Sequence, residues 1–119
     1  MEDQIKILVA EDEALVAMDI EYGLEDMGVS VVGPCLSLEE TLEVVESKEI
    51  DAAILDIDLQ GKTVFPAAKK LTEIGVPFVF HSGRKDVQQV LDLFPQSKLF
   101  CKPTNPSVML TALEEMLAA

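Results

Sequence analysis

Five short apolar segments, separated by longer stretches with helical periodicity, constrain the fold of this chain more than any other feature. Each segment is rich in aliphatic or aromatic residues and is bounded by charged or turn-forming residues, as buried strands are. The five predicted strands cover residues 5–10, 29–33, 52–56, 77–81 and 98–102.

The intervening stretches have the pattern of amphipathic helices. Between residues 13 and 27, Val16, Ile20 and Leu24 recur at helical spacing on one face. Ser37 and Glu40 have the spacing of a capping box, which predicts the start of the second helix. Further helices are predicted for residues 62–74, 86–94 and 107–117.

Strands and helices therefore alternate along the chain, which predicts an α/β fold. Parallel strands need crossover connections, and right-handed crossovers place helices on both faces of the sheet. We expect one three-layer, doubly wound domain with a five-stranded parallel sheet, for which a length of 119 residues is sufficient. In such sheets a ligand site lies at the carboxyl ends of the strands.

The charge balance argues against several classes of partner. Nine basic residues against 22 acidic ones give a formal net charge of −13, which repels nucleic acid and anionic lipid. We expect no direct nucleic acid binding and no membrane association. The N-terminus lacks the basic start of a secretory signal, so we expect a cytoplasmic protein. Cys35 and Cys101 have no metal-ligand spacing and are predicted to be reduced, buried or half-buried residues.

Polar residues follow four of the five predicted strands. Because the carboxyl ends of parallel strands meet at one edge of the sheet, these side chains should lie together. Carboxylates, a hydroxyl and an ammonium group are used both in phosphate chemistry and in metal binding. The candidate site residues are Glu11, Asp12, Asp56, Ser82 and Lys102.

Three carboxylates in one cleft repel each other, so the set predicts a compensating divalent cation. Mg²⁺, or Mn²⁺ in its place, suits oxygen ligands and leaves positions open for phosphate. A second interpretation is that Glu11 and Asp12 only stabilise the start of the following helix. Asp56 ends a rigid apolar strand and could accept a phosphoryl group, with Lys102 and Ser82 as donors to the transferred oxygens.

The segments ILVAEDE, AILDIDL, FVFHSG and LFCKP resemble the four signature segments of the response-regulator receiver family, in the family's order. The resemblance covers essentially the whole chain and implies a receiver domain over residues 1–119. It implies a flavodoxin-like fold with strand order 2-1-3-4-5. The Lys102-Pro103 bond is expected to be cis, as in the family.

The same resemblance assigns a role to each candidate residue. Asp56 matches the phosphorylated aspartate, Lys102 the invariant lysine and Ser82 the switch hydroxyl. The implied metal ligands are Asp12 directly, Glu11 through water, Asp56, and the backbone carbonyl of Asp58.

The family also implies the partners. The phosphoryl donor would be a sensor histidine kinase or a histidine phosphotransfer protein, and the receiver would later hydrolyse its own phosphoryl group. The protein would act as a timed switch, not as a turnover enzyme, on a downstream protein partner or output domain. The sequence leaves open whether the receiver stands alone or belongs to a larger regulator.

The chain departs from the family pattern at two places. Leu99 occupies the usual position of the aromatic switch residue, while Phe100 should point to the opposite face of its strand and join the core. The segment DIDLQG lacks the usual proline, and with PFVFHSG it resembles receivers that partner a distinct class of sensor kinase. His81 is predicted to be a packing residue, and Asp58 and Arg84 are expected to flank the pocket.

Two other functions remain possible from the sequence. Asp56-Ile57-Asp58 resembles the nucleophile motif of haloacid-dehalogenase-like phosphatases, although that motif belongs on a first strand and here follows the third. A degenerate receiver, which binds proteins without ever accepting phosphate, is the second alternative. The complete set of acceptor, acids, hydroxyl and lysine argues against it.

Overall fold

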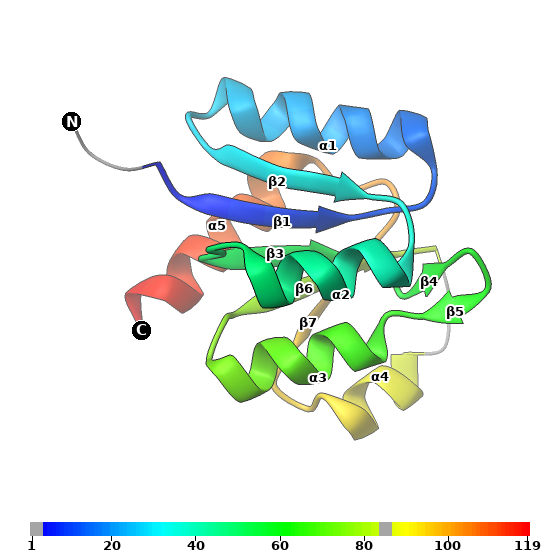
Figure 1. Ribbon diagram of the computed structural model, residues 1–119. Coiled ribbons are helices and arrows are strands. Elements are labelled where there is room, and N and C mark those ends of the chain that lie inside the picture. The colour runs from blue at the N-terminus through cyan, green and yellow to red at the C-terminus, as the bar shows by residue number, and fades with distance from the viewer. Residues whose placement is uncertain (1–3, 84–86) are drawn as a thin grey trace.

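The computed structural model describes residues 4–83 and 87–119 and contains a five-stranded parallel sheet (Figure 1). The order of the strands is β2-β1-β3-β6-β7, which is 2-1-3-4-5 when these five are counted along the chain. The predicted order is therefore confirmed. The strands are β1 (Lys6–Ala10), β2 (Ser30–Cys35), β3 (Ala52–Leu55), β6 (Phe78–Ser82) and β7 (Lys98–Cys101).

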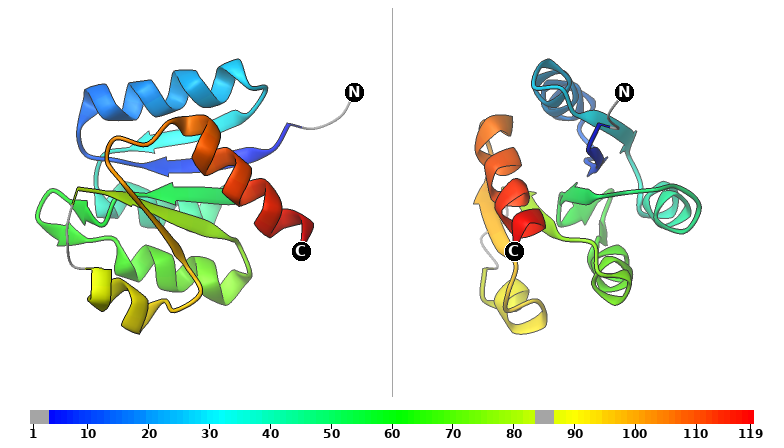
Figure 2. Two further views of the ribbon diagram at one scale, coloured as in Figure 1. Left: turned by 180° about the vertical axis from the view of Figure 1, so that it is seen from behind. Right: turned by 90° about the vertical axis from the view of Figure 1, so that its left-hand side faces the viewer.

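Helices cover both faces of the sheet, which confirms the three-layer prediction. One face carries α1 (Ala14–Asp26) and α5 (Pro106–Ala118), and the other carries α2 (Leu38–Ser47) and α3 (Phe65–Ile74) (Figure 2). The fourth helix, α4 (Val87–Leu93), packs through Val90 on the α3 side. The predicted helix over 86–94 corresponds to α4, which ends one residue earlier than predicted, at Leu93. Residue 86 lies outside the described residues.

Alternation along the strands divides the core into two clusters. Ile7 and Val9 of β1 pack with residues of α1 and α5, whereas Leu8 packs with residues of α2 and α3. Four phenylalanines also gather on the α3 side, with ring centroids 5.3–6.2 Å apart. They are Phe65, Phe78, Phe80 and Phe94. With both faces covered, the polar groups of the sheet gather at the ends of its strands.

A small hairpin that the sequence did not predict lies between β3 and α3. Strand β4 (Asp58–Leu59) pairs antiparallel with β5 (Lys62–Thr63). The two residues between them, Gln60 and Gly61, have positive φ angles of 55° and 85°, as a two-residue type I′ turn requires. The predicted helix over 62–74 is thus wrong at its start, because α3 begins only at Phe65.

The structure tests the predictions for Ser37, for the two cysteines and for the Lys102-Pro103 bond. Ser37 caps α2 by accepting from the Glu40 N–H at 3.1 Å, while the Glu40 carboxylate accepts from Leu36 N–H. Both cysteines are free, but Cys101 is exposed, not buried or half-buried as expected. The Lys102-Pro103 peptide bond is cis. Within the described ranges, none of the helices has the length and hydropathy needed to span a bilayer.

Candidate functional site

The predicted site residues lie at the carboxyl edge of the sheet. Glu11 and Asp12 follow β1, Asp56 follows β3, and Lys102 follows β7. Backbone bonds fix this arrangement, because Asp56 N–H donates to Ala10 at 2.8 Å and Lys102 N–H donates to Ser82 at 3.1 Å. One carboxylate oxygen from each of the three acids lies within 4.8 Å of the others.

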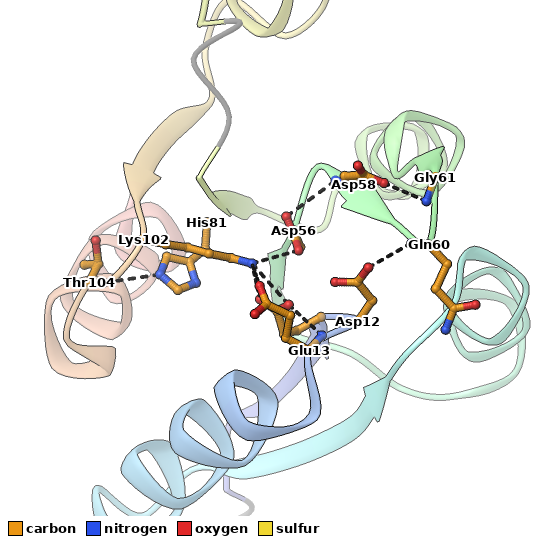
Figure 3. Close-up of polar contacts among 10 residues, drawn as sticks. Asp12, Glu13, Asp56, Asp58, Gln60, Gly61, His81, Lys102 and Thr104 are labelled. Carbon is orange, nitrogen blue, oxygen red and sulfur yellow. Dashed lines mark hydrogen bonds and ion pairs between the residues drawn. The ribbon is translucent and has the colours of Figure 1, made fainter.

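The Lys102 ammonium lies among these acids (Figure 3). Its Nζ is 2.9 Å from Asp56 Oδ2 and 2.9 Å from Glu11 Oε1. Burial alone lowers the pKa of Lys102, but hydrogen bonds and attraction to Glu11 and Asp56 outweigh burial and raise it. The lysine therefore remains charged and neutralises part of the acidic cluster.

One ammonium does not compensate the burial of the acids. Glu11 is only 1% exposed, and burial raises its pKa to about 7 although bonds from Glu13 N–H and Lys102 oppose the shift. Burial likewise raises the pKa of Asp56 against the opposing effect of Lys102. Glu11 Oε1 accepts no hydrogen bond from the described residues despite its ion pair with Lys102. A buried, incompletely bonded oxygen beside two further carboxylates fits a hard divalent cation.

The β4–β5 hairpin supports the acids through its backbone. Gln60 N–H donates to Asp12 Oδ2 at 2.9 Å, and Asp58 N–H approaches Asp56 Oδ1 at 3.4 Å (Figure 3). The Asp58 carboxylate instead accepts from Gly61 N–H at 2.8 Å, within the hairpin. Asp58 thus flanks the site as predicted, with its side chain bound to the turn, which disfavours the general-acid role required by the phosphatase interpretation.

Sequence reasoning missed two residues at this site, Gln60 and Glu13. Gln60 contributes a main-chain N–H, and only the Gln-Gly pair hints at the turn that presents it. The Glu13 Oε1 atom lies 3.3 Å from Lys102 Nζ, and Glu13 N–H donates to Glu11 at 2.9 Å. The signal for Glu13 was its place as the third consecutive acid after β1.

Ser82 and His81 are neighbours at the end of β6. Ser82 is buried, 1% exposed, and is paired in register with Cys101. His81 is also buried, as its predicted packing role requires, but its Nε2 accepts from Thr104 N–H at 3.2 Å. Burial, and then the charge of Lys102, lowers the pKa of His81 to about 4. Arg84, expected at the pocket, lies outside the described residues.

Leu99 and Phe100 point to opposite faces of β7, as predicted. Leu99 packs against the cluster on the α3 side, and Phe100 packs against the cluster formed with α1 and α5. Phe100 is thus partly buried against the core on the face of the sheet opposite to Leu99. The usual aromatic position is filled by an aliphatic side chain.

Comparisons with known proteins agree with this fold. The model of the response regulator receiver domain matches residues 7–114, and the chain belongs to this family. The transcriptional regulatory protein PdtaR of Mycobacterium tuberculosis (strain CDC 1551 / Oshkosh) is 31% identical over 114 residues, which cover 92% of this chain and 55% of PdtaR. This chain thus spans about half the length of that relative.

Two solved structures share the fold over nearly the entire chain. The solution structure of SdrG from Sphingomonas melonis Fr1 is 33% identical, with a TM-score of 0.81 and complete coverage of both chains. A response regulator receiver protein from Sinorhizobium medicae WSM419 is 28% identical, with a TM-score of 0.86 and coverage of 98% and 97%. Membership of this signalling family replaces the phosphatase interpretation.

Proposed function

We propose that this protein is a phosphorylation-dependent switch in which Asp56 accepts a phosphoryl group. The observation that carries the proposal is the contact of Asp56 Oδ2 with Lys102 Nζ at 2.9 Å, beside Glu11 and Asp12. This arrangement combines a carboxylate nucleophile with a fixed cationic donor and an acidic metal site. Glu11 shares these neighbours, since its Oε1 atom is also 2.9 Å from Lys102 Nζ, but the family resemblance assigns the acceptor role to Asp56 and a metal-binding role to Glu11.

The acids would hold Mg²⁺, or Mn²⁺ in its place. Asp12, Asp56 and the backbone carbonyl of Asp58 would be ligands, with Glu11 acting through water. When bound, the ion would neutralise the charge of the carboxylates and of the phosphoryl oxygens. The support for this part is the raised pKa of Glu11 and Asp56 and the incompletely bonded Glu11 oxygen.

The residues of this chain then perform the transfer by position and charge. An Asp56 oxygen attacks the phosphorus of a phosphohistidine donor. The bond from phosphorus to the histidine nitrogen breaks, and its electron pair passes to that nitrogen. Lys102 pairs with the Asp56 carboxylate before the transfer and with the negatively charged phosphoryl oxygens after it. The Ser82 hydroxyl donates a hydrogen bond to one of these oxygens. Later attack by water on phosphorus releases inorganic phosphate and restores the Asp56 carboxylate.

The donor in this proposal is a phosphohistidine on a sensor histidine kinase or a histidine phosphotransfer protein. The phosphorylated receiver would change the surface seen by a downstream protein partner or output domain in the cytoplasm. Its one phosphoryl group per activation makes it a switch, with no turnover of a separate substrate. The domain would extend over residues 1–119, beyond the matched residues 7–114.

Incubation with Mg²⁺ and acetyl phosphate, followed by intact mass spectrometry, tests the proposal. The wild-type protein should gain the mass of one phosphoryl group, and Asp56→Asn should gain none. Asp26→Asn, which changes an exposed aspartate of α1, is the matched control and should behave as wild type. If the wild-type protein gains no phosphoryl group and beryllofluoride with Mg²⁺ leaves its NMR spectrum unchanged, the degenerate receiver is the correct interpretation.

A further inference from the structure

We propose that His81 is a positioning residue for Lys102, because its imidazole ring fixes the turn that carries the lysine. We call residues Lys102-Pro103-Thr104 the lysine turn. The inference rests on the proposed function, in which Lys102 contacts the transferred phosphoryl group. It assigns His81 a task beyond packing, and this task follows from hydrogen bonds at the end of β6.

His81 is placed to reach the lysine turn from inside the protein. It is 3% exposed and lies beside Phe100 in the β6–β7 register. Phe100 and Val79 both pack against the cluster formed with α1 and α5, so His81 lies on that face of the sheet. Figure 3 shows its ring between the Lys102 side chain and Thr104.

The lysine turn has few backbone bonds of its own. Lys102 N–H donates to the Ser82 carbonyl at 3.1 Å, and Pro103 has no N–H to donate. Thr104 N–H donates to His81 Nε2 at 3.2 Å, and its hydroxyl donates to the Cys101 carbonyl at 2.6 Å. Two consecutive residues of β6 therefore hold the turn on both sides of Pro103. The Ser82 carbonyl binds Lys102, and the His81 ring binds Thr104.

The ring acts as an acceptor, which requires the neutral imidazole with its proton on Nδ1. His81 Nδ1 is buried and makes no hydrogen bond with the described residues. Buried polar atoms usually have partners, so a side chain needed only to fill space would better be apolar. The polar contact that distinguishes His81 from such a side chain is its bond to Thr104. Burial and Lys102 keep the pKa of His81 at about 4, so the acceptor form persists at neutral pH.

A displaced lysine turn has a distinctive expected effect. Lys102 pairs with Glu11 and Asp56, so moving it away removes a cation that competes with Mg²⁺ for these acids. Mg²⁺ affinity should then stay constant or increase, while phosphoryl transfer slows because the donor is misplaced. General damage to the fold would instead weaken Mg²⁺ binding and transfer together.

The experiment compares His81→Phe, which removes the acceptor, with His81→Gln, which retains an acceptor near the same place. Phosphorylation by acetyl phosphate is followed by mass spectrometry, and Mg²⁺ affinity by calorimetry. His81→Phe should slow phosphorylation about tenfold or more without weakening Mg²⁺ binding, and His81→Gln should recover most of the rate. Phe100→Leu, a packing change on the same face, is the control and should not separate the two quantities.

The inference is overturned if His81→Phe phosphorylates at the wild-type rate, or if its rate and Mg²⁺ affinity fall together. NMR of the wild-type protein tests it without any variant. His81 should show a protonated Nδ1 and an unprotonated Nε2, and the Thr104 amide should exchange slowly with solvent. The opposite tautomer contradicts the inference. If wild-type Asp56 accepts no phosphoryl group while the NMR result holds, the proposed function fails but the His81 bond stands.

Discussion

The three carboxylates of the site and the lysine turn are held by different kinds of bonds. Each carboxylate accepts a main-chain N–H, from Glu13 for Glu11, from Gln60 for Asp12 and from Asp58 for Asp56. The lysine turn instead depends on a side-chain ring and on a carbonyl of β6. Side-chain substitutions should therefore disturb the lysine more readily than the acids.

The two regions also differ in what their charges cost the folded protein. Burial raises the pKa of Glu11 to about 7 and raises that of Asp56, so both carboxylates are unfavourable when charged. Lys102 is favourable when charged, since its ion pairs outweigh its burial. The buried negative charges of the acids therefore destabilise the folded protein. Lys102 compensates part of this unfavourable free energy, and a second cation would compensate more of it.

The largest expected effect comes from removing the ammonium. Lys102→Met should reduce the rate of phosphorylation by acetyl phosphate by about 100-fold, the usual cost of losing one preorganised donor. Mass spectrometry over a time course measures the rate. Lys98→Met, at the exposed start of β7, is the matched control and should retain the wild-type rate. Equal rates in Lys102→Met and wild type would show that Lys102 does not assist phosphoryl transfer.

The unfavourable burial of the charged acids should make the free energy of unfolding depend on pH. The folded pKa of Glu11, about 7, exceeds its ordinary value of 4.5, so the folded protein binds this proton more tightly than the unfolded chain does. Its contribution to the free energy of unfolding therefore falls as pH rises from 4.5 to 7. In metal-free protein at pH 8, Glu11→Gln should raise that free energy by about 1–3 kcal/mol.

Urea unfolding with a chelator measures this effect, with Glu43→Gln on exposed α2 surface as control. Added Mg²⁺ should stabilise the wild-type protein more than Glu11→Gln, because the ion binds the folded acids. A Glu11→Gln variant that is less stable than wild type at pH 8 without metal would show that the charged acid is not costly.

The backbone support of the acids can be tested at the hairpin. Gln60 has a positive φ of 55°, which a β-branched side chain tolerates poorly. Gln60→Val should lower the free energy of unfolding by about 1–2 kcal/mol and weaken Mg²⁺ binding, since its N–H would leave Asp12. Gln60→Asn, which suits the turn, should preserve both. Unchanged Mg²⁺ affinity in Gln60→Val would mean that the hairpin does not support the site.

The smallest effect is expected for the exposed acid beside the lysine. Glu13 Oε1 lies 3.3 Å from Lys102 Nζ, and the Glu13 side chain is 66% exposed. Exposed ion pairs contribute little, so Glu13→Gln should change the phosphorylation rate by less than about fivefold. A loss as large as that of Lys102→Met, in the same mass-spectrometric assay, would show that Glu13 and not the buried acids positions the lysine.

Much of this architecture could be predicted because it depends on periodicity. The five apolar runs and the helical stretches between them indicated the layers, and the polar residues after the strands indicated one edge. Glu11, Asp12, Asp56 and Lys102 are brought together there, as expected. The strand order came from the family resemblance, because alternation alone does not fix the order.

The features that were missed depend on individual backbone bonds. The hairpin turns at Gln60-Gly61, and glutamine at a positive φ is not a typical turn signal. The bond from Thr104 to His81 joins residues 23 positions apart, and it depends on how the lysine turn bends back to β6. Patterns of residue type do not specify such contacts, so the support of the site was less predictable than its members.

Locating the phosphoryl group tests most directly whether Asp56 is the acceptor. Protein treated with Mg²⁺ and acetyl phosphate would be reduced with borohydride, which converts an aspartyl phosphate to homoserine, and then sequenced by tandem mass spectrometry. If Asp56 is the acceptor, homoserine should appear at position 56, with Asp12 and Asp58 unchanged. Homoserine at another position, or a phosphate ester on Ser82 with Asp56 intact, would contradict it.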